Sequence, residues 1–417
     1  YSVNVPFWSD RAIKQRWFSL PNPLEKITFH REEPWLFPAG TTWIKHFDLQ
    51  ITNGVPSSAR RLETRVLVKN DFGIHGATYR WDADGLGARL VPDAGASETI
   101  LTYYGGAVRS QVWQYPSRAQ CLQCHTAVGG YALGFQTAQL NQLVDYDGFH
   151  QNQIDALARA GYLDVPEVAS ATLPELVSGS DVNASREFRV RSYLHVNCVQ
   201  CHQPGGPGRS LWDARIATPR SRTGLIDGLP VHDFESPLDR LIKPGSLEHS
   251  VLWNRLANAG KGHMPPLGTQ VLNAEALDLI GGWILQDLPA LESYEKWRSR
   301  LIALNAPRLT GPEGDFDGDG SINYAEYLLA TDPRSAADHV RLTIERGPDR
   351  TLLRFPWKAN LGFQVQWTED PVDPGSWRAL DSAGNRPFYL SSPAEGVIED
   401  VAPPGDLRYY RLTVREP

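Results

Sequence analysis

The chain has 417 residues, of which 41% are hydrophobic and 21% charged, so it can form several domains and has the composition of a globular protein. The net charge of −7 gives no support to nucleic-acid binding, and the lack of an apolar run of about 18 residues excludes a membrane-spanning helix. The sequence begins at Tyr1 without a Met or an apolar leader, so we expect a processed chain that has lost a signal peptide.

Residues 1–115 alternate apolar and polar side chains in short runs. The runs 42–49, 63–69 and 77–81 show this pattern, and turns separate them. A period of two is typical of strands with one buried face. We predict an N-terminal antiparallel β-sandwich over residues 1–115. Its expected role is to cover a prosthetic group bound by the next segment, and a ligand-binding domain is the alternative.

A first cysteine motif follows, with the sequence Cys121-Leu-Gln-Cys124-His125. C-x-x-C-H is the attachment signature of haem c, because two thiols on one helical turn reach the two vinyl groups of one porphyrin. The adjacent His then ligates the iron from the proximal side. We therefore predict a mainly helical first haem c unit over residues 116–187, with Cys121 and Cys124 holding the haem and His125 as the iron ligand.

The same pattern recurs as Cys198-Val-Gln-Cys201-His202, so all four cysteines of the chain belong to two motifs. A thioredoxin-like dithiol has no use for the His, and a four-thiolate zinc site would leave both His residues unexplained. We predict two covalently bound haem c groups and no disulfide. Helical spacing before Cys198 and over residues 274–288 predicts a second, mainly α-helical cytochrome c domain over residues 188–295.

The single methionine, Met264, lies within this second domain and precedes two prolines that would hold a loop rigid. We predict that Met264 is the sixth ligand of the second haem, opposite His202, which raises the reduction potential. The alternatives are a Met that fills a gap in the core and ligation by the neighbouring His263.

One Met can serve only one haem, so the first haem is ligated by a second His, by another donor, or is five-coordinate. His46 and His75 are the candidates for its distal ligand. The other histidines after or before the motifs are His30, His150, His195, His232, His249 and His339. The choice matters because a six-coordinate haem transfers electrons, whereas an open haem can bind peroxide or oxygen.

Residues 113–125 and 133–141 around the first motif, 191–206 around the second, and 264–268 are distinctive. Together they resemble a poorly characterised family of bacterial two-haem c-type cytochromes, and the resemblance covers residues 1–290. It implies a periplasmic or cell-surface redox protein, sometimes associated with quinoprotein-type sugar or alcohol dehydrogenases, and no established reaction. The residues that carry over are Cys121, Cys124, His125, Cys198, Cys201, His202 and Met264.

Residues 296–335 are expected to form a linker with a calcium loop. The stretch 315–326 matches the twelve-residue EF-hand loop, in which oxygen ligands come from positions 1, 3, 5, 7, 9 and 12 and a Gly makes the turn at position 6. These positions are filled by Asp315, Asp317, Asp319, Ser321 (through its backbone carbonyl), Asn323 (through water) and Glu326, with Gly320 at the turn. An acidic surface turn is the alternative. No second loop pairs with it, so we expect one structural Ca²⁺ and not a sensor.

Residues 336–417 again alternate in short runs, which predicts a small immunoglobulin- or fibronectin-like β-sandwich. We expect it to be a spacer or docking module, because it contains no catalytic motif. The expected fold is therefore multidomain α+β, with an N-terminal β-sandwich, two mainly α-helical cytochrome c units and a small C-terminal β-sandwich.

Haem c is attached outside the cytoplasm, so we expect a bacterial periplasmic, extracellular or cell-surface protein. The first hypothesis for function is a two-haem electron carrier with a redox partner protein, for which a periplasmic dehydrogenase is a candidate. The second is a haem oxidoreductase, similar to a peroxidase or oxygenase, whose first haem is open. The third is a surface-attached binding protein in which the C-terminal modules dominate.

Overall fold

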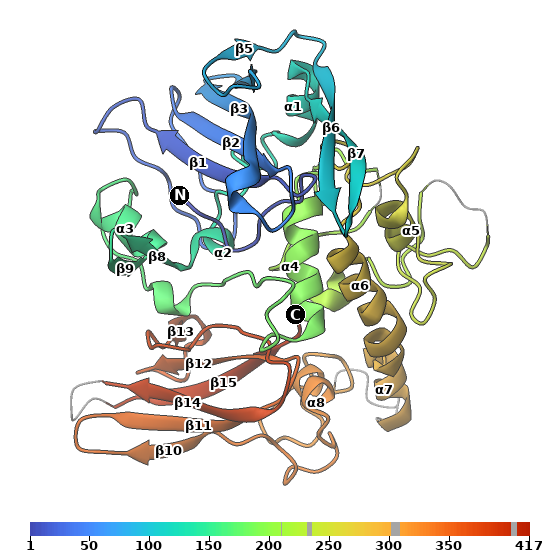
Figure 1. Cartoon of the computed structure of the whole chain (residues 1–417). Helices are drawn as coiled ribbons and strands as arrows, with labels where there is room; N and C mark the ends of the chain where they lie inside the picture. The colour runs from blue at the N-terminus through green and yellow to red at the C-terminus, as the bar shows by residue number, and fades with distance from the viewer. Residues whose placement is uncertain (210, 232–235, 302–308, 402–406) are drawn as a thin grey trace. The chain divides into compact units, whose positions relative to one another are not determined.

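The computed structural model describes residues 1–209, 211–231, 236–301, 309–401 and 407–417 (Figure 1). It is mainly β, with 28% strand and 20% helix. The prediction of two mainly α-helical cytochrome c units is therefore wrong, although β modules are present. No helix in the described ranges combines the length and the apolar character that crossing a membrane requires.

Proline explains why the second motif is not followed by a helical domain. Pro204, Pro207, Pro219, Pro237 and Pro244 interrupt the chain between the second motif and Met264. Each proline lacks a backbone N–H and its ring clashes with the preceding helical turn. The helical spacing before Cys198 and over residues 274–288 is realised in helices, whereas the described chain between these stretches forms only short helices joined by turns.

The chain divides into two compact units. The first contains Tyr1–Val168, Glu175–Gly179 and Val190–Gly281, and the second contains Ala169–Pro174, Ser180–Arg189 and Gly282–Pro417. The division of the sequence into five segments stays a prediction.

An antiparallel five-stranded sheet opens the first unit, with its strands in sequence order (Figure 1). Its strands are β1 (Ile13–Ser19), β2 (Thr42–Gln50), β3 (Ala59–Asn70), β4 (Gly73–Trp81) and β5 (Ala88–Leu90). In β2, Trp43, Phe47 and Leu49 are buried while the residues between them are more exposed, which is the alternation that a strand with one buried face requires.

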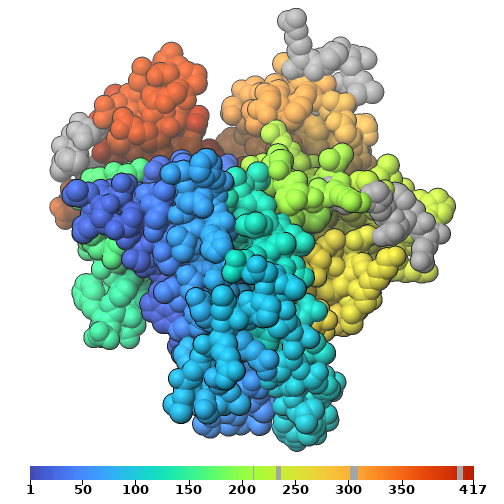
Figure 2. All heavy atoms as spheres, turned by 90° about the horizontal axis from the view of Figure 1, so that it is seen from above, coloured from blue at the N-terminus to red at the C-terminus, as the bar shows by residue number. Residues whose placement is uncertain are grey.

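A hairpin of β6 (Ala96–Tyr104) and β7 (Ala107–Tyr115) packs against this sheet. Ile100 and Trp113 from the hairpin share one apolar core with Leu49 and Leu62 from the sheet. The opposite face of the hairpin is exposed, for example at Leu101, and the cyan atoms of Figure 2 show this part of the chain on the surface. The N-terminal β region is therefore a sheet covered by a smaller hairpin.

The remaining elements of the first unit are short, and two helices continue beyond its limits. They are α1 (Arg118–Cys124), α2 (Thr137–Leu140), β8 (Leu143–Tyr146), β9 (Phe149–Asn152), α3 (Gln153–Arg159), α4 (Arg186–Cys198), α5 (Val251–Ala257) and α6 (Ala274–Gly282). Single turns of 3₁₀-helix lie at Pro56–Ser58, Ser170–Thr172, Arg220–Arg222, Leu288–Ala290 and Pro374–Ser376, and a π-helical turn lies at Trp283–Asp287.

The second unit is built around two three-stranded sheets, which are ordered β10-β11-β14 and β13-β12-β15 (Figure 1). Its elements are α7 (Tyr294–Leu301), α8 (Asn323–Leu329), β10 (Thr343–Arg346), β11 (Thr351–Trp357), β12 (Gly362–Thr368), β13 (Arg378–Ala379), β14 (Ala394–Asp400) and β15 (Tyr409–Arg415). Leu353 and Ile398 from one sheet and Phe363 and Val365 from the other form a common core. This packing makes a small β-sandwich.

The core between the N-terminal sheet and its hairpin is tested by a pair of leucine substitutions. Leu62 is fully buried and Leu86 is 88% exposed. We expect Leu62→Ala to lower the free energy of unfolding by about 2–5 kcal/mol, because it removes methyl groups from a packed core. Leu86→Ala should change it by less than about 0.5 kcal/mol. Urea denaturation followed by tryptophan fluorescence measures both, and equal losses would contradict this packing.

Candidate haem-binding site

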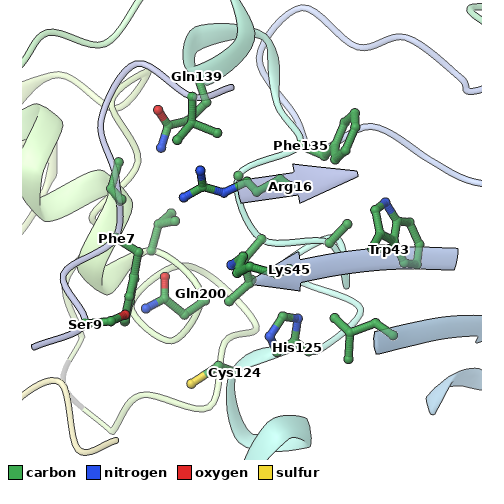
Figure 3. Close-up of a pocket in the computed structure, with 18 of the residues that line it drawn as sticks. Phe7, Ser9, Arg16, Trp43, Lys45, Cys124, His125, Phe135, Gln139 and Gln200 are labelled. Carbon is green, nitrogen blue, oxygen red and sulfur yellow. The ribbon is translucent and has the colours of Figure 1, made fainter. Parts of the chain in front are cut away.

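The first unit contains a cavity with a volume of about 170 Å³, measured as the space that the centre of a water molecule can reach. Trp43, Phe47 and Phe135 give it apolar walls. Figure 3 shows Cys124 and His125 together at one end of it. A concave, mostly apolar site with a few polar groups is the usual form of a cofactor pocket.

Helix α1 places the first motif on this cavity. Its N-terminus is closed by a capping box, in which the Ser117 hydroxyl accepts a hydrogen bond from the Gln120 amide (3.1 Å) and the Gln120 side chain accepts one from the Ser117 amide (2.8 Å). The helical turn that follows brings Cys121, Cys124 and His125 to the cavity wall. β4 approaches closely, since a Cβ added at Gly76 would lie 3.6 Å from the Cys121 sulfur.

His125 has the hydrogen bond that an iron ligand needs. Its Nδ1 lies 2.6 Å from the carbonyl oxygen of Tyr131, and because a carbonyl can only accept, Nδ1 carries the proton. Nε2 then has a free lone pair, and it forms no hydrogen bond within the described residues. Burial lowers the pKa of His125 to about 4, so the ring is neutral at pH 7. Metal-ligating histidines are held in the same way, by donating the proton of the other ring nitrogen to a carbonyl, a carboxylate or water.

The second motif lies at the end of α4, where the chain turns back on itself. The His202 amide donates to the Cys198 carbonyl (2.8 Å), and the Gly208 amide donates to the Cys201 carbonyl (2.9 Å). A Cβ at Gly208 would lie 2.9 Å from Nδ1 of His202, so only glycine allows this close return. The His202 ring also stacks on Trp212, with ring centroids 4.8 Å apart.

The two motifs meet through their second cysteines. The thiols of Cys124 and Cys201 share a hydrogen bond, and the Cys201 sulfur lies 3.9 Å from the carbonyl oxygen of Gln123. Gln203 adds a further link, because its side chain donates to the Val128 carbonyl (3.3 Å). The sequence did not predict this contact, since no local pattern connects the two motifs.

The arrangement does not fit the two alternative thiol chemistries. Within the described residues, the only group of three or more His, Cys, Asp or Glu ligand atoms that lie within 4.8 Å of one another is the acidic group at residues 315–319, so the four thiols form no zinc site there. Burial raises the pKa of Cys121, and it raises that of Cys198 to about 12. The shared hydrogen bond raises the pKa of Cys124 and lowers that of Cys201. Three of the four thiols thus lack the lowered pKa of reactive dithiols.

Met264 lies in a separate pocket. This pocket has a volume of about 10 Å³ by the same measure and is lined by Trp8, Tyr193, His263 and Met264, among others. None of the second motif's cysteines or its His202 lines it. The structure therefore does not bring Met264 and His202 into one cavity, and the sixth-ligand role of Met264 stays a prediction.

Neither candidate for the distal ligand of the first haem lines the large cavity. His46 occupies the opposite face of β2 from Lys45, where its Nδ1 lies 2.6 Å from the Thr64 hydroxyl and its ring packs edge-on against Trp17. His75 is exposed on β4, and the next residue in that strand, Gly76, is the one that faces Cys121. His232 lies outside the described residues.

His195 lines the cavity, and the sequence analysis did not single it out. It is 3% exposed and lies near the end of α4, in which most residues from Glu187 to Asn197 are buried. Burial lowers the pKa of His195 to about 4. The available signal was a His within the helical stretch that the sequence predicted before Cys198.

The calcium-type loop lies in the second unit. Its three aspartates, Asp315, Asp317 and Asp319, hold carboxylate oxygens within 4.8 Å of one another. Gly318 and Gly320 have φ of 77° and 93°, a backbone conformation that favours glycine and allows the sharp turn. Backbone amides donate hydrogen bonds to some of these carboxylate oxygens. For example, the Gly318 amide donates to Asp315 (2.8 Å).

Several oxygens of this loop are left for a cation. Glu326 is fully buried in the first turn of α8, and neither of its carboxylate oxygens has a hydrogen-bond partner. One oxygen each of Asp317 and Asp319 is also buried without a hydrogen bond, although that of Asp319 lies 3.5 Å from Nδ1 of His339. Burial and the nearby aspartates raise the pKa of Glu326 to about 8. Ser321 supplies its amide to Asp319 (2.7 Å), which leaves its carbonyl as the expected ligand. Such a donor set fits Ca²⁺.

Asn323, the expected water-mediated ligand, is engaged elsewhere. Its side-chain amide donates to the carbonyls of Leu309 (2.7 Å) and Gly311 (2.8 Å), and its Oδ1 is buried without a hydrogen bond. In this structure Asn323 therefore ties the loop to the chain before it.

Searches for related proteins gave no match with any protein-family model, any curated protein or any solved structure. The resemblance to two-haem cytochromes thus rests on the motifs described above.

Calcium is expected to stabilise the second unit. Ca²⁺ at about 100 times its dissociation constant should add about 2.7 kcal/mol to the free energy of unfolding, because it binds only the folded loop. Glu326→Gln should abolish most of this gain, whereas Glu313→Gln, at an exposed position just before the loop, should keep it. Thermal unfolding with Ca²⁺ or with a chelator measures the effect. Equal calcium responses of the two variants would speak against the site.

Proposed function

We propose that this chain is a two-haem c-type electron-transfer protein of the bacterial periplasm or cell surface. The observation that carries the proposal is the cavity beside the first motif, in which Cys121, Cys124 and His125 share one wall. Apolar walls beside two thiols and a neutral imidazole are the surroundings that a covalently bound haem requires.

The hydrogen bond of His125 is the one that the proximal ligand of a haem needs. Cys121 and Cys124 would hold the two vinyl positions, and His125 would ligate the iron through Nε2. The Tyr131 carbonyl keeps the proton on Nδ1 and fixes the ring. This residue set explains why the His directly follows the second Cys, which neither a zinc site nor a dithiol requires.

The charges around the cavity also favour an anionic occupant. Arg16 and Lys45 project toward it from β1 and β2 (Figure 3), and neither forms an ion pair within the described residues. Arg65 also lines it but is paired with Glu63 at 2.5 Å. Burial and its cationic neighbours lower the pKa of Lys45 well below the ordinary range. Buried cations without partners are costly, so the carboxylates of haem propionates would stabilise this wall.

The second site has the same motif but a less open setting. Cys198 and Cys201 would hold its haem, and His202 would be the proximal ligand. The stack on Trp212 and the close return of Gly208 fix the orientation of His202. Met264 is proposed as the sixth ligand, which requires the loop that carries it to come together with His202.

The contact between the two motifs supports electron transfer. Haem c supplies one-electron redox chemistry when it is bound. The chain keeps the two attachment helices together through Cys124 and Cys201 and through the bond from Gln203 to Val128. With the two attachment sulfurs in contact, no protein would lie between the two haem sites at that point. Fast electron exchange between two redox groups needs such a short separation.

The cellular setting and the partner follow from this chemistry. Covalent haem attachment would put the chain outside the cytoplasm, where calcium is available for a structural site at Asp315, Asp317, Asp319, Ser321 and Glu326, with Asn323 holding the loop to the chain before it. We propose one Ca²⁺ there in addition to two haems. The partner is a redox protein that delivers or accepts electrons, with a periplasmic dehydrogenase as the candidate. A haem oxidoreductase with an open first haem is the second candidate function, which the cavity at that site favours.

Haem stoichiometry tests the proposal. In protein matured in a bacterial periplasm, the pyridine haemochrome assay should give two haems per chain. Cys121→Ala combined with Cys124→Ala should give one, and so should Cys198→Ala combined with Cys201→Ala, because each motif attaches one haem. His75→Ala, at an exposed position away from the cavity, should keep both. Periplasmic protein without covalent haem would overturn the proposal.

A further inference from the structure

We propose that His195 is the sixth ligand of the haem held by Cys121, Cys124 and His125. This inference rests on the proposed function and goes beyond it, because it names the residue that would close the first haem. It comes from the position of His195 in the structure, since the sequence offered only a pool of unassigned histidines.

His195 and His125 line the same cavity from different elements. His125 follows α1, whereas His195 lies on α4, and Val196 and Val199 of the same segment also line the cavity. Gln200, which follows α4, also lines the cavity and is drawn beside Lys45 in Figure 3. A flat ligand that enters between these two walls would meet one histidine from each.

The free nitrogen of His195 is the second observation. His195 is 3% exposed, and its Nε2 is buried without a hydrogen-bond partner. A buried polar nitrogen of this kind is costly unless something binds it, and native structures contain few of them. An iron on that nitrogen would satisfy it.

The other nitrogen of the ring, Nδ1, accepts a hydrogen bond from the Ile216 amide at 3.1 Å. The backbone of Ala214 also hydrogen-bonds with the ring and raises its pKa. Ligation through Nε2 requires the proton on Nδ1, so binding of the iron would exchange the bond from the Ile216 amide for one from Nδ1 to a carbonyl, and the carbonyl of Ala214 is the candidate acceptor.

The other nitrogen donors are placed less well. His46 and His75 do not line the cavity. Lys45 does, but it lies beside His125 (Figure 3) and close enough for its charge to lower the pKa of that ring. This position suits a carboxylate partner at the edge of the haem, on the same side as His125.

If His195 is the ligand, α4 serves both haems. It would supply the distal ligand of the first haem through His195 and the first attachment sulfur of the second through Cys198, one helical turn further on. With Met264 as the sixth ligand of the second haem, both irons would then be six-coordinate, and the chain would conduct electrons and not bind peroxide.

The test compares His195→Ala with His46→Ala in full-length protein matured in the periplasm. Optical spectra and low-temperature EPR of the oxidised protein report the spin state, and haem per chain is measured on the same samples. We expect wild type and His46→Ala to show a low-spin first haem that does not respond to cyanide. His195→Ala should keep two haems, gain a high-spin signal from one of them and bind cyanide there.

Low-spin spectra in His195→Ala, or a high-spin first haem in the wild type, would overturn the inference while leaving two haems per chain and the proposed function intact. A shift to high spin in Lys45→Ala but not in His195→Ala would also overturn it. If His195→Ala does not mature, His195→Met provides the readout. Thioether ligation should then raise the potential of one haem, and two unchanged potentials would contradict the assignment.

Discussion

The contact between Cys124 and Cys201 is the interaction on which the account of this molecule depends. It joins a helix that follows the N-terminal sheet to a helix much later in the chain, and so it turns two separate attachment motifs into one paired centre. If both thiols become thioethers, their hydrogen bond is lost, but the bond from the Gln203 side chain to the Val128 carbonyl does not involve the thiols and remains.

A second constraint is the balance of charge and hydrogen bonds around the cavity. The sheet brings Arg16 and Lys45 to an apolar site without carboxylate partners, and α4 brings a histidine with an unpartnered nitrogen. Each feature alone would be a cost to the fold. A bound haem, with a metal in its centre and two carboxylates at its edge, would remove both costs at once. The arrangement is therefore easier to understand as a cofactor site than as an empty apolar cavity.

Local patterns in the sequence predicted local structure well and long-range structure poorly. The alternation in β2 matches its buried face. The expected helical domains were wrong, although the helical spacing before Cys198 and from residue 274 is realised, because the described chain between these two stretches is rich in Pro and Gly and forms mostly turns. His195 and the meeting of Cys124 with Cys201 could not be predicted, because both depend on how α1 and α4 pack, which no short pattern encodes. The position of Met264 in a pocket apart from His202 was hidden for the same reason.

The most direct test of the paired centre is low-temperature EPR of the oxidised protein, compared with two variants that each lack one attachment motif. Two adjacent ferric haems interact magnetically, so the account predicts that the native spectrum differs from the sum of the two single-haem spectra, with broadened or shifted signals. A native spectrum equal to that sum would mean that the haems lie far apart. The contact between Cys124 and Cys201 would then not describe the mature protein.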